Sequence, residues 1–568
     1  MCMSAVLFVG FSCFLLSNGV QGDGCQQKFQ SIQSLQVELP SQQPYRTAYH
    51  FQPPQNWLNG PMYYKGLYHL FYQYNPYGVC FGDKMIWAHS VSYDLIDWFN
   101  LEPALRPSEP FDINSCWSGS ATILPGNKPV ILYTGIDSNN QQVQNLAIPK
   151  NLSDPLLIEW VKYSKNPLMT PPDGVKVDEF RDPTTAWKGL DGKWRVIIGS
   201  LNKAILYQSE DFLHWTKSQE PLYSSGETGM WECPDFYPVS VNGTNGVDTS
   251  VQNPSVRHVM KAGFNSHDYY MLGTYVPEAD IFLPYINFTG TSLDLRYDYG
   301  KFYASKTFFD SVKNRRILWG WVNESDSAKD DLEKGWSGLQ SIPRQIWLDR
   351  TGKQLLQWPV EEINGLHNNL VSIHDFQLEN GSAFEISGIT AAQADVEIVF
   401  ELPELEEAEF MNSSQVDPQE ICTNGDASVS GIFGPFGLLT LATKDLAERT
   451  AIFFRVFKGH EGYVVLMCND QSRSSMKKET DKTTYGSFVG IDPRQEKISL
   501  RSLIDHSIIE SFAGEGRTCI TTRVYPKFAV NEEAHLYAFN NGTQDVKISS
   551  LNAWSMNRAQ INSWGSLK

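Results

Sequence analysis

A short pattern that ends in tryptophan occurs twice in the first half of the chain and constrains the fold more than any other feature. Residues 92–98 read Ser-Tyr-Asp-Leu-Ile-Asp-Trp and residues 209–215 read Ser-Glu-Asp-Phe-Leu-His-Trp, so both fit Ser-X-Asp-apolar-X-X-Trp. Each copy follows a run that is typical of a β-strand. Similar turns also arise without a repeat, but repeated four-strand units with an equivalent Trp are typical of β-propeller blades. The copies lie 117 residues apart, which corresponds to about two blades.

The rest of the chain also favours β-structure, and its length calls for more than one domain. Aromatic residues flank Lys65-Gly66 as in a hairpin, and no helical periodicity is sustained before residue 355. The 568 residues exceed what one hydrophobic core normally supports. A second β-rich region after residue 369 has the strands and turn signals of a β-sandwich. We therefore predict an all-β protein with a β-propeller at 51–358, a linker or short helix at 359–369 and a β-sandwich at 370–568.

The N-terminal residues predict a secreted protein. Residues 1–22 resemble a secretory signal peptide, because an apolar core is followed by small residues that suit cleavage, and a polar arm follows at 23–50. The apolar core is too short to span a bilayer comfortably. Asn-X-Ser/Thr sequons support the secretory route. The seven predicted glycosylation sites are Asn151, Asn242, Asn287, Asn323, Asn380, Asn412 and Asn541.

Cysteine usage and charge narrow the function further. Two of the nine cysteines leave with the signal peptide, and the remaining seven are an odd number, so at least one has no partner within the chain. Cys422 and Cys468 are the candidate disulfide, although other pairings remain open. No spacing resembles a zinc site, and we predict neither a metal nor a cofactor. A net charge of -18 without any basic run argues against nucleic acid and anionic membranes as partners.

Two isolated carboxylates are the candidate catalytic residues. Glu232 lies within Trp-Glu-Cys-Pro-Asp at 231–235, and Asp182 lies within Phe-Arg-Asp-Pro at 180–183. A carboxylic acid among apolar neighbours ionises less readily, which suits a general acid. Sugar hydrolysis passes through an oxocarbenium-like transition state that anions stabilise. A strand with one solvated Glu is the alternative for Glu232, but the two carboxylates together indicate sugar chemistry.

Six motifs of the propeller region are specific in combination. They are Phe51-Gln52-Pro53-Pro54 with Asn56-Trp57, Phe71-Tyr72-Gln73-Tyr74-Asn75-Pro76, Trp87-Ala88-His89-Ser90, Trp117-Ser118-Gly119-Ser120-Ala121-Thr122, Phe180-Arg181-Asp182-Pro183 and Trp231-Glu232-Cys233-Pro234-Asp235. Through them the chain resembles the plant acid invertases and fructan exohydrolases of glycoside hydrolase family 32 over nearly its full length. The resemblance implies a five-bladed β-propeller with the site in its axial funnel, a C-terminal β-sandwich, and retaining hydrolysis of terminal β-fructofuranosyl groups.

The resemblance also implies residue roles. Glu232 would be the acid/base, and Asp182 would bind fructose hydroxyls and stabilise the transition state. The substrate-binding residues would be Trp57, Asn59, Gln73, Phe81, Trp117, Ser118, Arg181 and Tyr275, with propeller packing as the alternative for the tryptophans. The implied partner is a fructan or sucrose substrate, with a proteinaceous invertase inhibitor as a further candidate. We also predict a monomer that is secreted to the cell wall (the apoplast), with the vacuole as the alternative.

One departure from the family pattern concerns the nucleophile. The family has Trp-X-Asn-Asp-Pro-Asn-Gly-Pro, whose first Asp is the nucleophile, whereas this chain reads Trp57-Leu58-Asn59-Gly60-Pro61. Asp-Pro-Asn is missing between Asn59 and Gly60, and no Asp or Glu occurs between Glu38 and Asp83. Retaining glycosidases need two carboxyl groups about 5–5.5 Å apart. Because the flanks read as intact, we favour loss of a small exon over gradual decay, and we predict that this chain is impaired.

A second departure concerns the substrate. Cell-wall invertases typically have Trp-Gly-Asn where this chain has Phe81-Gly82-Asp83, and they carry an Asp and a Lys where Val276 and Ala279 stand. The resemblance implies that those two polar residues help to hold the glucose of sucrose. Val276 accepts no hydrogen bond from a sugar hydroxyl, so this reading favours a fructan exohydrolase, although Val276 could also be neutral strand packing. The alternatives are an invertase acting on sucrose and a secreted fructoside-binding pseudoenzyme.

Overall fold

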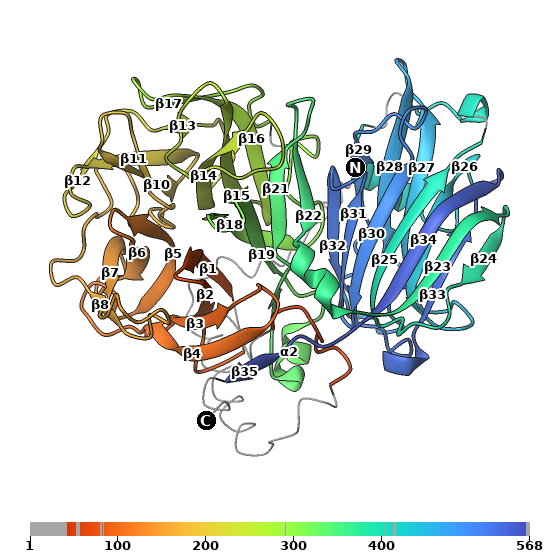
Figure 1. Cartoon of the computed structure of the whole chain (residues 1–568), viewed down its shortest axis with the longest axis horizontal. Helices are drawn as coiled ribbons and strands as arrows, with labels where there is room; N and C mark the ends of the chain where they lie inside the picture. The colour runs from red at the N-terminus through yellow and green to blue at the C-terminus, as the bar shows by residue number, and fades with distance from the viewer. Residues whose placement is uncertain are drawn as a thin grey trace, which may run out of the picture.

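The computed structural model describes residues 43–52, 57–79, 82, 84–289, 291–403, 405–412 and 416–563, and it describes the backbone alone at 57–59 and at 563. The predicted signal peptide, residues 23–42 of the predicted arm and Phe81 lie outside the described residues. The N-terminal part consists of small sheets around a common axis, and the C-terminal part consists of two larger sheets (Figure 1). The predicted all-β class, a propeller followed by a sandwich, is confirmed. No helix among the described residues is long and apolar enough to cross a membrane.

Five antiparallel sheets form the blades of the propeller in the described part of the chain. Blade one contains β1 (Trp57–Tyr64), β2 (Leu67–Tyr74), β3 (Ile86–Ser92) and β4 (Trp98–Leu105), and blade two contains β5 (Ser115–Leu124), β6 (Lys128–Ile136), β7 (Gln142–Pro149) and β8 (Trp160–Lys162). Blade three contains β9 (Trp187–Lys188), β10 (Trp194–Ser200), β11 (Lys203–Ser209), β12 (Trp215–Lys217) and β13 (Tyr223–Ser224). Blade four contains β14 (Glu232–Ser240), β15 (Val256–Phe264), β16 (His267–Val276) and β17 (Ile281–Pro284). Blade five contains β18 (Phe302–Asp310), β19 (Arg315–Val322), β20 (Leu339–Gln340), β21 (Arg344–Leu348) and β22 (Leu355–Pro359).

The Trp-ending repeat forms the same tight turn in blades one and three. In both copies the serine hydroxyl accepts the backbone N–H three residues ahead, at 2.8 Å from Leu95 and at 2.9 Å from Phe212. Both apolar residues have a φ of 69°, in the left-handed region. The tryptophan of each copy, Trp98 or Trp215, donates its indole N–H back to the carbonyl of that apolar residue at 3.1 Å. The repeat therefore marks equivalent blade corners that lie two blades apart.

Each blade carries a one-residue bulge near the start of its first strand. The pairing register slips by one between Asn59 and Met62 of β1, and equivalent slips occur in β5, β14 and β18. In blade three, Arg181 bridges to Gly199 and the Thr184 N–H donates to the Ile197 carbonyl. The register therefore also slips by one residue between Arg181 and Thr184. Bulges re-aim side chains and are common next to active sites. The bulges of blades three, four and five lie at the same end of the propeller, because the residues that precede them, Arg181, Glu232 and Tyr303, contact one another.

The last strand in the described part of the chain belongs to the propeller. The strand β35 (Ile561–Ser563) pairs in parallel with β4, so it extends blade one. It lies within the stretch 370–568 that the sequence assigns to the sandwich. The link from propeller to sandwich is the 3-10 helix η2 (Glu361–Leu366), which lies within the predicted linker.

Two sheets of six strands form the sandwich in the described part of the chain. One contains β23 (His367–Leu378), β34 (Val546–Met556), β25 (Gln393–Glu401), β30 (Ile498–Asp505), β31 (Ile508–Ala513) and β32 (Thr518–Arg523). The other contains β24 (Ser382–Glu385), β33 (His535–Asn540), β26 (Phe433–Ala442), β27 (Thr450–Lys458), β28 (Tyr463–Asp470) and β29 (Tyr485–Val489). The short helices here are α3 (Pro418–Asn424), η3 (Leu405–Glu407) and η4 (Asn531–Glu533).

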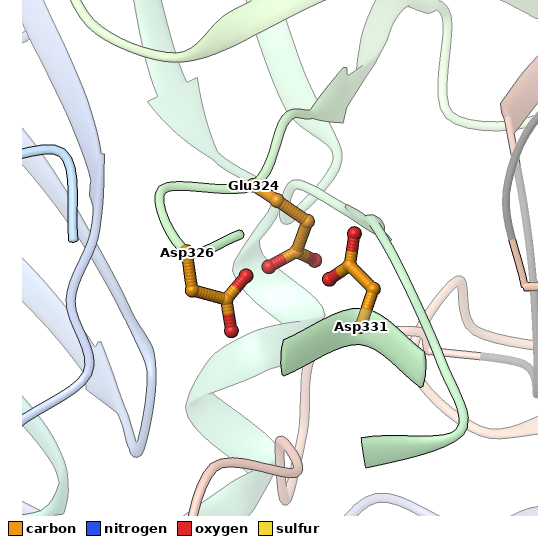
Figure 2. Close-up of side chains that lie close together, drawn as sticks. All are labelled: Glu324, Asp326 and Asp331. Atoms are coloured by element: carbon orange, nitrogen blue, oxygen red, sulfur yellow. The ribbon is translucent and has the colours of Figure 1, made fainter. Parts of the chain in front are cut away.

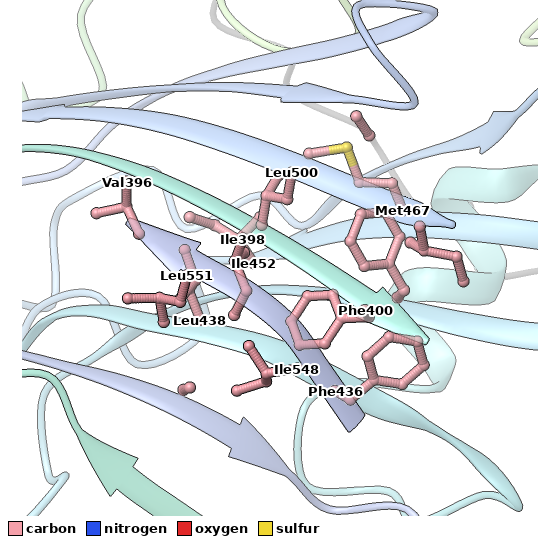
Figure 3. Close-up of a cluster of buried hydrophobic side chains, with 14 of the residues drawn as sticks. Val396, Ile398, Phe400, Phe436, Leu438, Ile452, Met467, Leu500, Ile548 and Leu551 are labelled. Atoms are coloured by element: carbon pink, nitrogen blue, oxygen red, sulfur yellow. The ribbon is translucent and has the colours of Figure 1, made fainter. Parts of the chain in front are cut away.

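The alternating pattern of the sandwich strands forms its core. Val396, Ile398 and Phe400 are spaced by two residues on β25, so they point to one face, where they meet Phe436 and Leu438 of the opposite sheet (Figure 3). All five are fully buried. The predicted disulfide between Cys422 and Cys468 is formed and ties α3 to β28.

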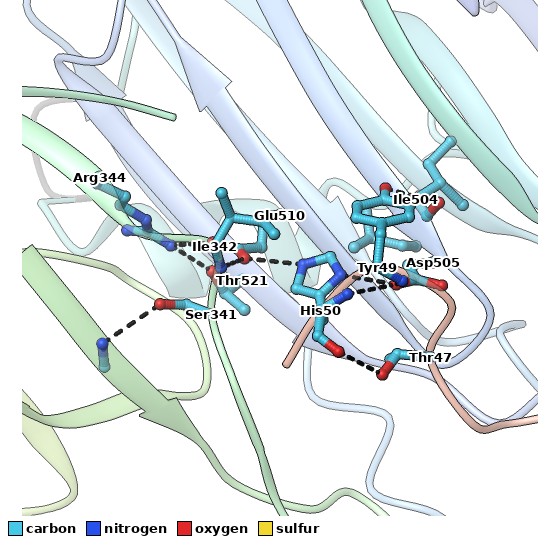
Figure 4. A network of polar contacts seen from close by, with 12 residues as sticks. Thr47, Tyr49, His50, Ser341, Ile342, Arg344, Ile504, Asp505, Glu510 and Thr521 are labelled. Carbon is cyan, nitrogen blue, oxygen red and sulfur yellow. Dashed lines mark hydrogen bonds and ion pairs between the residues drawn. The ribbon is translucent and has the colours of Figure 1, made fainter. Parts of the chain in front are cut away.

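The described end of the arm, residues 43–50, is anchored where the two domains meet. The Asp505 carboxylate accepts the backbone N–H groups of Ala48, Tyr49 and His50 at 2.7–2.9 Å. The His50 ring bridges two sandwich carboxylates, with Nδ1 2.9 Å from Asp505 and Nε2 3.0 Å from Glu510 (Figure 4). Glu510 also pairs with Arg344 of blade five at 2.6 Å. These buried charges join the arm, the propeller and the sandwich.

Candidate active site

Arg181, Glu232 and Tyr303 occupy equivalent positions in blades three, four and five. Each is the last residue before its bulge, and the residue that follows each has a left-handed φ of 66°, 44° or 53°. Their side chains meet at one point: the Arg181 Nη2 lies 2.7 Å from Glu232 Oε1, and the Tyr303 hydroxyl donates to Glu232 Oε2 at 2.5 Å. The side chain of Glu232 is 20% exposed, so it remains accessible. The repeated bulge thus brings two side chains, Arg181 and Tyr303, to the carboxylate of a third residue, Glu232.

Asp182 lies beside this group. Its Oδ2 accepts the backbone N–H of Cys233 at 2.8 Å and lies 4.0 Å from Arg181 Nε. Its own backbone N–H donates to the Thr134 hydroxyl of blade two at 2.9 Å. Blades two, three and four therefore fix the second carboxylate, and Arg181 contacts both carboxylates.

The charges of the group reinforce one another. Burial opposes the charge on Arg181, but Glu232 and Asp182 outweigh burial and raise the pKa of its guanidinium. Burial and the Glu232 carboxylate raise the pKa of the Tyr303 hydroxyl well above its usual value. Arg181 therefore stays cationic, and Tyr303 stays a neutral hydrogen-bond donor to Glu232.

The predicted pocket residues of blades one and two form a second group. Gln73 Nε2 donates to the Ser118 hydroxyl at 3.0 Å, which joins β2 to the bulge of β5. Trp117 is partly exposed, and its carbonyl accepts the indole N–H of Trp87 at 2.9 Å. The side chains of Trp57 and Asn59 lie outside the described residues.

Tyr275 lies far from Glu232, which corrects the prediction from the resemblance. The ladder pairs Glu232 with Gly263 and Gly263 with Asp268, so Asp268 marks the Glu232 end of blade four. Tyr275 is seven residues farther along β16 than Asp268. A strand rises ~3.3 Å per residue, so Tyr275 lies about 23 Å from Asp268 along the strand. It is buried among aromatic rings and packs on Trp187. Tyr275 is therefore a core residue between blades three and four.

Val276 and Ala279 lie at the same remote end. Val276 pairs with Ile281 where β16 turns into β17, so neither residue faces a sugar that is bound at Glu232. Val276 therefore does not weaken the binding of glucose, which corrects the prediction from the sequence. Tyr303 was not predicted from the sequence. Its signal is its place in the repeated bulge, because Tyr-Ala-Ser at 303–305 aligns with Arg-Asp-Pro at 181–183 and Glu-Cys-Pro at 232–234.

The predicted glycosylation asparagines differ in accessibility. Those exposed in the described part of the chain are Asn151, Asn242, Asn287, Asn323, Asn380 and Asn412. Asn541 is half-buried, and its amide nitrogen donates to the Ala427 carbonyl at 3.1 Å. Because this nitrogen would carry the glycan, we expect Asn541 to be the least modified of the seven.

A carboxylate cluster near α2 (Ala328–Lys334) is the arrangement closest to a metal site within the described ranges. Glu324, Asp326 and Asp331 turn their carboxylates toward one another (Figure 2). The ammonium of Lys334 lies 2.5–3.3 Å from all three, and Arg523 pairs with Glu324 at 2.9 Å. Burial and the charge of Glu324 raise the pKa of Asp326 to about 8 and that of Asp331 to about 6. Lys334 therefore supplies the cation that this cluster needs.

Comparison with known proteins decides the family. Residues 50–359 match the Glycosyl hydrolases family 32 N-terminal domain, and residues 362–555 match the Glycosyl hydrolases family 32 C terminal. The chain belongs to glycosyl hydrolase family 32. Family 32 members are β-fructosidases, so the resemblance inferred from the six motifs is confirmed.

The similar proteins include both invertases and fructan exohydrolases. The chain is 58% identical to the insoluble β-fructofuranosidase isoenzyme CWINV1 of Arabidopsis thaliana, over 93% of this chain and 94% of that protein. It is 56% identical to the fructan 6-exohydrolase of Beta vulgaris, over 91% and 88%. A crystal structure of fructan 1-exohydrolase IIa from Cichorium intybus in complex with 1-kestose superimposes with a TM-score of 0.91 at 61% identity, covering 92% of this chain and 99% of that chain.

Proposed function

We propose that this family 32 chain is built to release terminal fructose from fructans by a retaining mechanism, and that it is impaired by the loss of its nucleophile. The observation that carries the proposal is the placement of Glu232 between Arg181 and Tyr303, with Asp182 next to it. A partly exposed carboxylate held by two donors, beside a second carboxylate, is a suitable arrangement for acid/base work on a glycosidic bond.

The proposed roles follow from this geometry. Glu232 donates a proton to the leaving oxygen as the bond from that oxygen to the anomeric carbon breaks, and later takes a proton from the water that releases fructose. Asp182 is held by the Cys233 amide, and it accepts hydrogen bonds from fructose hydroxyls and stabilises the positive charge that develops on the sugar. Tyr303 and Arg181 fix the carboxylate of Glu232 so that its proton is directed to one position.

The missing step is the attack on the anomeric carbon. In the family pattern the attacking Asp directly follows the Asn that corresponds to Asn59. In this chain Gly60 follows Asn59 instead. The pairing of Tyr64 with Leu67 fixes the register of β1 from its hairpin end. A three-residue loss therefore draws the preceding residues along the strand by about 10 Å. We infer that the chain loses the attacking carboxylate and also moves Trp57 and Asn59 relative to the rest of the funnel.

Fructan is the proposed substrate, and the shortened fructan is the leaving group. Two observations support this choice: the chain is 61% identical to the Cichorium exohydrolase, and Phe81-Gly82-Asp83 departs from the invertase pattern. An invertase acting on sucrose is the second candidate, favoured by the 58% identity to the Arabidopsis isoenzyme. In a chain with Asp-Pro-Asn restored between Asn59 and Gly60, kcat/KM on inulin, levan and sucrose separates the two. A preference for sucrose over both fructans would overturn the exohydrolase assignment.

A third candidate is a secreted protein that binds fructosides without cleaving them, which the missing carboxylate favours. Calorimetric titration of the unrepaired chain with 1-kestose, with fructose release followed in parallel, tests it. Binding without turnover supports this function, and absence of binding contradicts it. The relatives' names and the sequons support the cell wall as the proposed location. We propose a monomer, with a proteinaceous invertase inhibitor as a candidate partner.

A further inference from the structure

The bulge of β14 holds both candidate catalytic carboxylates in place. The ladder slips between Glu232 and Asp235, so Cys233 and Pro234 are the bulged residues. Glu232 projects from the residue before the bulge, and the Cys233 amide donates to Asp182. A bulge removes ladder partners from the backbone groups that it contains. The geometry of the site therefore depends on what holds the carbonyls of Cys233 and Pro234.

Two buried lysines hold those carbonyls. Lys261 of β15 directs its Nζ at the Cys233 carbonyl at 2.9 Å, and Lys306 of β18 directs its Nζ at the Pro234 carbonyl at 2.9 Å. Their exposed fractions are 0% and 3%. Lys261 comes from the neighbouring strand of blade four and Lys306 comes from blade five, so strands of two blades hold the bulge.

Lys261 also contacts the Tyr303 side of the site. Lys261 Nζ donates to the Ser305 carbonyl at 3.0 Å and pairs with Asp268 at 2.9 Å. Ser305 belongs to the bulge that follows Tyr303, so one ammonium joins the bulges of blades four and five. The Asp268 Oδ2 accepts the backbone N–H of Ser305 at 2.7 Å, which closes the link.

Lys306 is costly to bury and has no ion-pair partner within 4.0 Å among the residues that the structure describes. Burial lowers its pKa, but a neutral amine still donates a hydrogen bond to a carbonyl. An apolar side chain would fill the same space without the desolvation cost. What an apolar side chain cannot supply is the hydrogen bond to Pro234.

We propose that Lys261 and Lys306 are positioning residues that fix the Cys233–Pro234 bulge and thereby aim Glu232 at the scissile bond. The inference rests on the proposed acid/base role of Glu232. It extends to Asp182, because the same bulge presents the Cys233 amide to that carboxylate. Loss of either lysine should displace both carboxylates together.

The first test uses the chain as it is and needs no activity. Crystal structures of the chain and of its Lys306→Met variant are compared at the Arg181–Glu232 contact, which is 2.7 Å here. The contact should open and the Pro234 carbonyl should turn in the variant. Lys306→Gln, which keeps an N–H donor, should preserve the contact and covers the case in which the Met variant does not fold. An unchanged contact in Lys306→Met would overturn the proposal.

The second test separates positioning from stability in the chain with Asp-Pro-Asn restored. Lys306→Met should lower kcat on 1-kestose by about 10²-fold, because a displacement of about 1 Å costs that much, with little change in KM. It should lower kcat far less on an aryl fructoside, whose leaving group departs without protonation. Lys301→Met is the control: Lys301 pairs with Asp481 of the sandwich and does not touch the bulge, so it should affect both substrates equally.

The outcomes distinguish the two proposals. Equal losses on both substrates in Lys306→Met would show that the lysine is only structural and would overturn the positioning role. If the restored chain with both lysines releases no fructose, the proposed function fails, and the crystallographic contact then decides the positioning role alone.

Discussion

His50 should make the stability of this protein depend on pH. Its two ring nitrogens face Asp505 and Glu510 at 2.9 and 3.0 Å, and only the protonated imidazolium can donate at both nitrogens. Burial opposes this charge, but the hydrogen bonds to the two carboxylates outweigh burial and raise the pKa of His50. Folding therefore favours the protonated form in the domain interface that Figure 4 shows.

The direction and size of the effect follow by linkage. Because the folded pKa is raised, the contribution of His50 is fully present below the unfolded pKa of about 6.5 and is lost as pH rises through the folded pKa. Within that window the free energy of unfolding should fall by about 1.4 kcal/mol per pH unit. Removal of one partner from a buried charge pair typically costs ~3–5 kcal/mol. The free energy of unfolding of His50→Gln should therefore be lower than that of the unchanged chain by about this amount below pH ~6.5.

Urea unfolding of the chain and of His50→Gln at about pH 5.5 and about pH 8 measures the effect. The stability gap between the two should be larger at the lower pH. His535→Gln is the matched control, because His535 forms a half-exposed pair with Glu385 at 2.7 Å, and it should cost less than ~1 kcal/mol. If the difference in the free energy of unfolding between the chain and His50→Gln is the same at both pH values, the proposed role of His50 is refuted.

Replacing Cys422 and Cys468 by Ser should lower the free energy of unfolding by about 2–4 kcal/mol, because the bridge closes a loop with a separation of 46 residues; unchanged urea midpoints would contradict this. In the restored chain, Glu232→Gln should lower fructose release by about 10²–10⁴-fold, and near-normal kcat would remove Glu232 from its role. Val276→Asp with Ala279→Lys should leave the ratio of sucrose to inulin turnover unchanged, since both positions lie at the end of blade four remote from Glu232; a several-fold rise would contradict the strand register.

Much of the fold was predictable because propeller blades repeat. The Ser-X-Asp-apolar-X-X-Trp turn is local, so its sequence determines its hydrogen bonds, and it marked equivalent corners of blades one and three. The sandwich was predictable from alternating apolar residues such as those of β25. The strand β35 was not, because three residues carry no pattern that identifies a partner as distant as β4.

Site residues were predictable where the residue type and its neighbours are unusual in the sequence. They were not predictable where a common residue acquires its role only through its place in the fold. Glu232 and Asp182 stand out as isolated carboxylates in Pro-bounded motifs. Tyr303 does not stand out among 25 tyrosines, and its role arises only from the bulge that blades three, four and five share. Tyr275 was misplaced because an antiparallel meander returns to each end of the blade in turn, and only the register shows which end a residue occupies.

The most direct test compares two chains that differ by three residues. Fructose release from inulin and sucrose is measured for the chain with the printed sequence and for the same chain with Asp-Pro-Asn inserted between Asn59 and Gly60. The insertion should restore hydrolysis, because it returns the attacking carboxylate opposite Glu232 and the register of β1. The chain as printed should release no fructose at a useful rate. Equal rates in the two chains would contradict the account and require another carboxylate to attack the sugar.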